Sequence, residues 1–106
     1  MKRFWLSWEE TSEDYRPISD PPNRAVLAWW CSGEAGDGSY STLVALVEAE
    51  SEDRAKLAIA LSWPVEKKVT TWRKWRFCNE VGFDYRPTDR FPITKPWQRE
   101  RVEGRL

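Results

Sequence analysis

The sequence contains no histidine, and only two cysteines and one methionine stand among its 106 residues. The absence of histidine excludes an imidazole base, the common Ser-His and Cys-His nucleophile pairs, and zinc sites with histidine ligands. Cys31 and Cys78 lack the C-x-x-C spacing of metal and redox motifs. We therefore expect two reduced, partly buried thiols, with a disulfide only if their strands are neighbours.

Long apolar runs are also absent. No stretch approaches the ~20 apolar residues of a membrane span, and the apolar run at 4–6 is too short for a secretory signal peptide. The sequence therefore predicts a cytoplasmic protein with no membrane contact. Its length fits one domain.

The net charge is zero, from 17 Lys+Arg and 17 Asp+Glu. This argues against a protein that coats nucleic acid or a membrane with its whole surface. The charge is uneven along the chain, because residues 1–53 hold four basic and eleven acidic residues (net −7) and residues 54–106 hold thirteen and six (net +7). Two interpretations stay open: separate acidic and basic faces, or two halves that interleave in the fold and pair their charges.

Alternation of residue types predicts three strands in the first half of the chain. Phe4, Leu6 and Trp8 share one face of a strand over 3–8, and Trp5 lies on the other face. A polar loop over 9–23 follows, and then strands over 24–32 and 40–49 form a hairpin. The strand over 40–49 has no polar face in its middle, so we expect it to be central and covered on both sides.

The pattern then changes to that of a helix over 52–62. Ser51 is a good N-cap residue, and the apolar arc consists of Ala55, Ala58, Ile59 and Leu61. A fourth strand is predicted over 71–78. The strand over 40–49, the helix and this last strand would form a crossover that sets the two strands parallel.

The order strand–strand–strand–helix–strand predicts a single α+β domain over residues 1–97. We expect a mixed sheet of about four strands, with one helix packed on one face and a Pro-rich C-terminal extension. Because one helix cannot cover the sheet, the Pro-rich segment with Phe83, Tyr85, Phe91 and Trp97, or a partner, is expected to cover the rest. Residues 98–106 are charged and predicted to be a flexible tail.

Eight tryptophans are the most unusual feature of the composition. Trp is hard to bury completely, its N–H needs a hydrogen-bond partner, and it is enriched at binding hot spots. Eight cannot all sit inside one small core. We predict that two or three remain partly accessible and mark a partner surface.

Cations alternate with aromatic rings over residues 72–76. Single-stranded nucleic acid binders use such surfaces, because bases stack on Trp while Lys and Arg contact phosphates. The structural alternative is a half-buried strand whose Arg stems cover Trp rings. The candidate partner-binding residues of this basic region are Trp72, Lys74, Arg76, Arg86, Arg90 and Trp97.

An acidic segment near the N-terminus offers a second candidate surface. Its residues are Glu9, Glu10, Glu13 and Asp14. An acidic strip can imitate phosphates and occupy a basic protein groove, and the structural alternative is a solvated loop. Nothing in the spacing predicts a catalytic pair of carboxylates, so we expect no enzyme activity and predict no catalytic residue, metal site or cofactor.

Several stretches of the chain resemble short uncharacterised proteins of bacteriophages and related mobile elements. They are residues 3–8, residues 47–51 leading through the predicted helix to Trp63-Pro64, residues 75–78 and residues 86–92. No catalytic signature accompanies the resemblance. It implies the class of small phage proteins that includes anti-CRISPR inhibitors of bacterial defence, which act by binding a protein complex.

The expected function is therefore a non-enzymatic, phage-type protein that inhibits a host protein or complex through exposed Trp and charged surfaces. Direct nucleic acid binding through the basic region is one alternative. A sponge or sensor for a small nucleotide is another, and it would need a pocket lined by Trp and Arg. The oligomeric state stays open.

Overall fold

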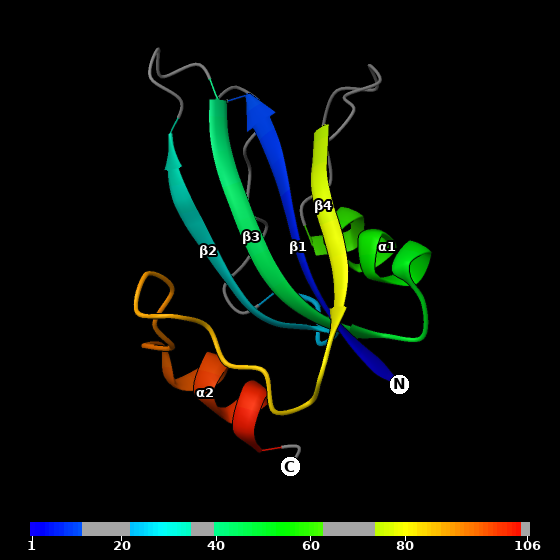
Figure 1. Cartoon of the computed structure of the whole chain (residues 1–106), viewed down its shortest axis with the longest axis vertical. Helices are drawn as coiled ribbons and strands as arrows, with labels where there is room; N and C mark the ends of the chain where they lie inside the picture. The colour runs from blue at the N-terminus through cyan, green and yellow to red at the C-terminus, as the bar shows by residue number, and fades with distance from the viewer. Residues whose placement is uncertain (12–21, 35–39, 63–73, 105–106) are drawn as a thin grey trace.

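The structure is a computed structural model that describes residues 1–11, 22–34, 40–62 and 74–104. Its elements follow one another as β1 (Lys2–Thr11), β2 (Val26–Glu34), β3 (Tyr40–Ala49), α1 (Glu52–Ser62), β4 (Lys74–Val81) and α2 (Pro96–Glu103). One sheet with a helix on each side results (Figure 1). The α+β architecture with a four-stranded sheet is confirmed.

The strands lie in the order β2-β3-β1-β4, and each neighbouring pair is antiparallel. β3 and β4 run parallel to each other, as the crossover predicted, because each is antiparallel to β1. However, β1 lies between them, so the expected mixed hydrogen-bonding pattern was wrong. The reason is that the N-terminal strand fills the gap that the crossover through α1 leaves.

Most element boundaries agree with the sequence pattern. β3 and α1 match the predicted ranges, and β2 and β3 form the predicted hairpin. β1 continues to Thr11, so Glu9 and Glu10 belong to a strand and not to the predicted loop. The predicted strand over 71–78 is observed as Lys74–Val81, and residues 71–73 lie outside the described part of the chain.

Helix α1 covers one face of the sheet. Ser51 caps it, since its hydroxyl accepts a hydrogen bond from the backbone N–H of Arg54 at 3.2 Å. The core beneath the helix is formed by alternate side chains of the strands, with the buried residues Phe4, Leu6, Trp8, Leu43, Ala45 and Val47. As predicted, β3 is central, and residues 43–47 are all buried.

The buried stripe of α1 differs from the prediction at one position. Residues 55, 58, 59 and 62 are buried and follow the i, i+3, i+4, i+7 spacing of one helical stripe. Leu61 lies beside this stripe and is 59% exposed, so its assignment to the core was wrong. Ser62 takes the buried place because its hydroxyl donates to the carbonyl of Ala58 and accepts from the N–H of Asn23.

The C-terminal segment 82–104 covers the other face, as the alternative without a partner predicted. The core on this side is formed by Leu27, Ala28, Leu46 and Val102, with Trp5, Trp30, Tyr85 and Ile93 packed around them. Residues 98–103, which were predicted as a flexible tail, belong to α2, and Gln98 and Val102 are buried. That prediction was wrong because polar contacts, described below, hold this helix to the sheet.

The two cysteines are free, with Cys31 exposed and Cys78 half-buried. Cys31 lies on β2 and Cys78 on β4, which are the two opposite edges of the sheet. Since neighbouring strands are about 4.8 Å apart, three strand spacings exclude a disulfide within one chain.

Candidate interaction surface at the β2–α2 edge

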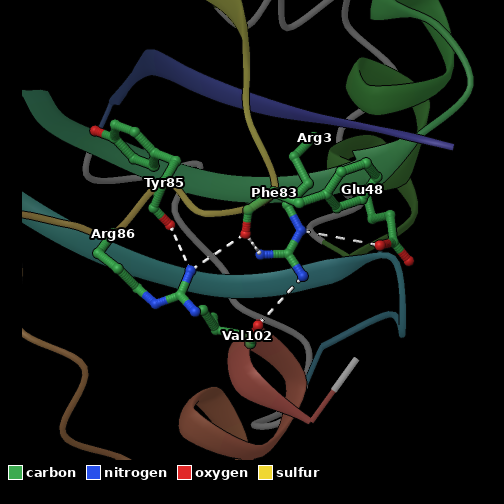
Figure 2. Close-up of polar contacts among 6 residues, drawn as sticks. All are labelled: Arg3, Glu48, Phe83, Tyr85, Arg86 and Val102. Atoms are coloured by element: carbon green, nitrogen blue, oxygen red, sulfur yellow. Dashed lines mark hydrogen bonds and ion pairs between the residues drawn. The ribbon is translucent and has the colours of Figure 1, made fainter. Parts of the chain in front are cut away.

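A buried arginine fastens the C-terminal segment to the sheet (Figure 2). Arg3 is fully buried, and its Nη1 and Nη2 donate to the carbonyl oxygens of Phe83 at 3.1 Å and Val102 at 3.2 Å. Its Nε lies 3.9 Å from a carboxylate oxygen of Glu48. The guanidinium also lies 5.2 Å from the centre of the Phe83 ring. One side chain of β1 thus binds β3, the chain after β4 and the last turn of α2.

Arg86 lies beside this centre and stabilises the turn that follows β4. Its Nη1 donates to the carbonyl oxygens of Phe83 at 3.2 Å and Tyr85 at 3.0 Å, so Arg3 and Arg86 share the Phe83 carbonyl (Figure 2). The side chain is half-buried. Arg86 therefore has a structural role in shaping the segment that crosses the sheet.

Side chains of α2 occupy the outer edge of β2. The Nε2 of Gln98 donates to the carbonyl of Trp29 at 2.9 Å, and Nη1 of Arg101 donates to the carbonyl of Val26 at 2.8 Å. Arg101 also donates to the carbonyls of Pro22 and Asn23. Edge strands expose backbone groups that can pair with another chain. The helix covers part of this edge with polar side chains.

A cluster of aromatic rings continues this contact over the face of the sheet. The Trp5 ring lies 5.8 Å from Trp30, 5.6 Å from Tyr85 and 5.7 Å from Phe91. The Trp30 Nε1–H donates to the carbonyl of Pro92 at 2.9 Å. Because tilted and edge contacts are favourable for aromatic rings, the cluster fixes the segment around Phe91 beside β2.

Three cations lie over aromatic rings along the same edge. Arg90 is 5.3 Å from the centre of the Phe91 ring, Lys95 is 5.6 Å from Trp29, and Arg101 is 5.0 Å from Trp97. All the rings are half-buried, while Arg90 and Lys95 are exposed. These residues lie around the β2 edge, since Trp29 packs against the core cluster beneath α1 and Trp30 against the cluster beneath α2. We call this set the aromatic–cationic surface; it consists of Trp29, Trp30, Phe91, Trp97, Arg90, Lys95 and Arg101.

The structure divides the described basic candidates among three places. Arg90 and Trp97 lie in the aromatic–cationic surface, and Arg86 lies in the turn after β4. Lys74 and Arg76 lie on β4, at the opposite edge of the sheet (Figure 1). Trp72 lies outside the described residues.

One acidic candidate, Glu9, meets two basic candidates where β1 pairs with β4. Glu9 lies opposite Lys74 in the strand pairing, and its carboxylate is 3.8 Å from Nε of Arg76. Lys2 pairs with Glu80 at the other end of the same two strands. At this place the acidic and basic halves of the chain interleave. The side chain of Glu10, and residues Glu13 and Asp14, lie outside the description.

The structure confirms that some tryptophan stays accessible, but the predicted number of two or three was too low. Trp8 is fully buried, and five others are half-buried. They are Trp5, Trp29, Trp30, Trp75 and Trp97. Trp63 and Trp72 are not described. Three of the five lie in the aromatic–cationic surface, which therefore holds most of the accessible tryptophan that the structure describes.

Sequence reasoning missed five members of this surface: Trp29, Trp30, Phe91, Lys95 and Arg101. Trp97 and Arg101 are four residues apart, a spacing that places two side chains on one side of a helix. This signal was present, but residues 98–106 were predicted to lack a helix. The contact between Lys95 and Trp29 joins residues far apart in the chain, and no local spacing predicts it.

Few of the described side chains have a pKa that departs clearly from its ordinary value. Burial, with a smaller contribution from Glu52, raises the pKa of the Cys78 thiol to about 11, so this thiol stays protonated at neutral pH. Burial also raises the pKa of Tyr85. Among the described residues, no group of three or more acidic or cysteine side chains is arranged to hold a metal ion.

Comparison of the chain with protein families, with curated proteins and with solved structures finds no match. In the described part of the chain, neither helix has the length and apolar character needed to cross a membrane.

Proposed function

We propose that this protein is a non-enzymatic binding protein and that the aromatic–cationic surface contacts its partner. The observation that carries the proposal is the set of three cation–ring pairs along one edge. Trp and Arg dominate binding hot spots, because they bring a large contact area together with directed polar groups. Here cations and backbone contacts already orient the rings, which lowers the entropy lost on binding.

A protein partner fits this surface better than a nucleic acid. Residues 90–104 contain Arg90, Lys95, Arg99 and Arg101 against Glu100 and Glu103, a net charge of +2. Nucleic acid binders usually neutralise many phosphates. A modest positive charge around half-buried rings suits a partner that presents a few carboxylates among apolar groups.

In the form that the phage resemblance implies, the partner is a complex of a bacterial host's defence, and the protein inhibits it in the host cytoplasm. The nucleotide sponge has less support. It needs a pocket lined by Trp and Arg, and in the described part of the chain two cavities, of about 400 and 370 Å³, are lined without tryptophan.

Affinity purification from a bacterial lysate, with and without nuclease treatment, tests the proposal. The wild type is compared with the double variant Arg90→Glu/Lys95→Glu, which reverses two exposed cations of the surface. The double variant Lys2→Glu/Lys74→Glu is the control, because it changes the net charge equally on β1 and β4. We expect the same protein complex with wild type and control, and at least about tenfold less with the surface variant.

Equal recovery with both variants would show that the partner binds elsewhere. Recovery that disappears on nuclease treatment would favour nucleic acid binding instead. Circular dichroism of both variants checks that the fold is retained, which we expect because Arg90 and Lys95 are exposed and Glu is favourable at a helix start.

A further inference from the structure

A groove runs between helix α1 and the ends of the strands, on the sheet face opposite α2. Its volume is about 400 Å³. One wall is formed by Arg54, Leu57 and Leu61 of α1, and the other by Met1 and Glu50 beside the end of β3. Figure 1 shows the N-terminus beside the loop that leads from β3 into α1.

The groove concentrates the exposed apolar side chains of the described chain. Met1 is 74% exposed, Leu61 59% and Leu57 45%, and the other large hydrophobic residue with such exposure is Phe83. Phe83 lies against the buried Arg3 and has a structural role. The three residues of the groove contribute to neither buried core cluster, so their apolar surface is open to another molecule.

The two walls carry opposite charges that are not paired with other side chains in the described part of the chain. Arg54 lies on the helix wall and Glu50 on the strand wall, and both are exposed. In the described part of the chain, neither side chain forms an ion pair or a side-chain hydrogen bond. In contrast, Glu52 and Lys56 on the neighbouring surface of α1 pair with each other at 3.0 Å.

We propose that this groove binds a second copy of the chain in a two-fold symmetric dimer. A two-fold axis above the groove places the helix wall of one copy on the strand wall of the other. Met1 of each copy then contacts Leu57 and Leu61 of its partner, and Arg54 of each copy faces the partner's Glu50. Such an interface is self-complementary, as a two-fold interface must be.

The charge pattern favours a second copy over an unrelated partner. A partner would need a cation, an acid and an apolar side chain spaced to match both walls, and this chain already presents that set. The residues that line the groove include none of the aromatic–cationic surface, so the dimer leaves that surface of each copy available. The dimer is therefore independent of the proposed function.

Sedimentation equilibrium across the micromolar range tests the proposal. Wild type is expected to reach twice the 12.5 kDa mass of the chain. Glu50→Lys and Arg54→Glu each bring like charges together across the axis, and each should weaken the dimer by at least about tenfold. An equimolar mixture of these two variants should form a heterodimer. Arg54 of the first variant then faces Glu50 of the second, and the introduced Lys faces the introduced Glu.

The mixing experiment distinguishes pairing between copies from a change in folding. A misfolded variant would not form a dimer on mixing. The proposed interface requires that the two variants form a heterodimer. A wild type that stays monomeric overturns the proposal, and so does a dimer that both charge reversals leave intact. The variant Leu57→Ser/Leu61→Ser, whose substitutions lie outside the buried stripe, should also be monomeric.

Discussion

Helix α1 lies on its face of the sheet through apolar side chains, whereas α2 lies against β2 largely through polar ones. The buried residues of α1 are Ala55, Ala58 and Ile59, with Ser62 at its end. In α2 only Gln98 and Val102 are buried, and Gln98, Arg101 and Arg3 supply the contacts to backbone carbonyls. Apolar packing needs only a matching surface, while each polar contact needs a particular acceptor at a particular place.

Gln98 illustrates how specific the polar attachment is. Its side-chain oxygen accepts from the N–H of Lys95 at the start of α2, and its nitrogen donates to the carbonyl of Trp29. One amide group therefore caps the helix and covers the edge of β2. The same attachment holds Trp97 and Lys95 beside β2, so the aromatic–cationic surface depends on it.

The largest effect is expected at the centre of the polar attachment. Arg3→Met should lower the free energy of unfolding by about 3–5 kcal/mol, because the carbonyls of Phe83 and Val102 and the carboxylate of Glu48 would lose a buried partner. Urea denaturation measures this. Lys2→Met is the control; its pair with Glu80 is exposed and should contribute less than about 1 kcal/mol. Equal effects would contradict a special role for Arg3.

On the apolar side, Ile59→Ala should lower the free energy of unfolding by about 3 kcal/mol, because it leaves a cavity beneath α1. The matched control on the same helix is Leu61→Ala, whose side chain is 59% exposed. We expect Leu61→Ala to lower the free energy of unfolding by less than about 1 kcal/mol in dilute protein. Thermal and urea denaturation compare the two, and a larger loss at Leu61 would reverse the assigned orientation of α1.

Gln98→Glu separates the two contacts of this side chain. The carboxylate can still accept from the N–H of Lys95, but it places an acceptor against the carbonyl of Trp29. We expect a loss of about 2 kcal/mol and faster hydrogen exchange in α2 than in α1. Glu100→Gln, at an exposed position of the same helix, should leave both quantities nearly unchanged. Uniform loosening of both helices would show that α2 is not attached separately.

The smallest effect on stability is expected from the two thiols, which lie at opposite edges. At pH 8.5, Cys31 should react with iodoacetamide at least about tenfold faster than Cys78, because Cys31 is exposed and burial raises the pKa of Cys78 to about 11. In the unfolded chain the Cys78 thiol titrates near 9.0, so its contribution to stability falls as pH rises from about 9 to 11. Mass spectrometry of alkylated peptides measures the rates, and equal rates would contradict the burial of Cys78.

The charge distribution shows that counts of charged residues along the chain do not reveal which charged side chains pair in the fold. The halves carry −7 and +7, which left separate faces and interleaving halves both open. In the described chain, β1 and β4 are neighbours, and Glu9 pairs with Arg76 while Lys2 pairs with Glu80. Candidate residues for two opposing hypotheses thus contact each other. The count could not show this, because β1 and β4 are far apart in the chain.

The sequence by itself determined the elements whose residues repeat with a clear period. The alternation of Phe4, Leu6 and Trp8, the apolar middle of β3 and the N-cap at Ser51 each depend on neighbours a few residues away. Tertiary structure alone decided the place of β1 between β3 and β4, the folding of α2 onto the sheet, and the gathering of Trp29, Lys95 and Trp97 at one edge. These features rest on single contacts between distant residues, and such contacts leave no periodic trace in the sequence.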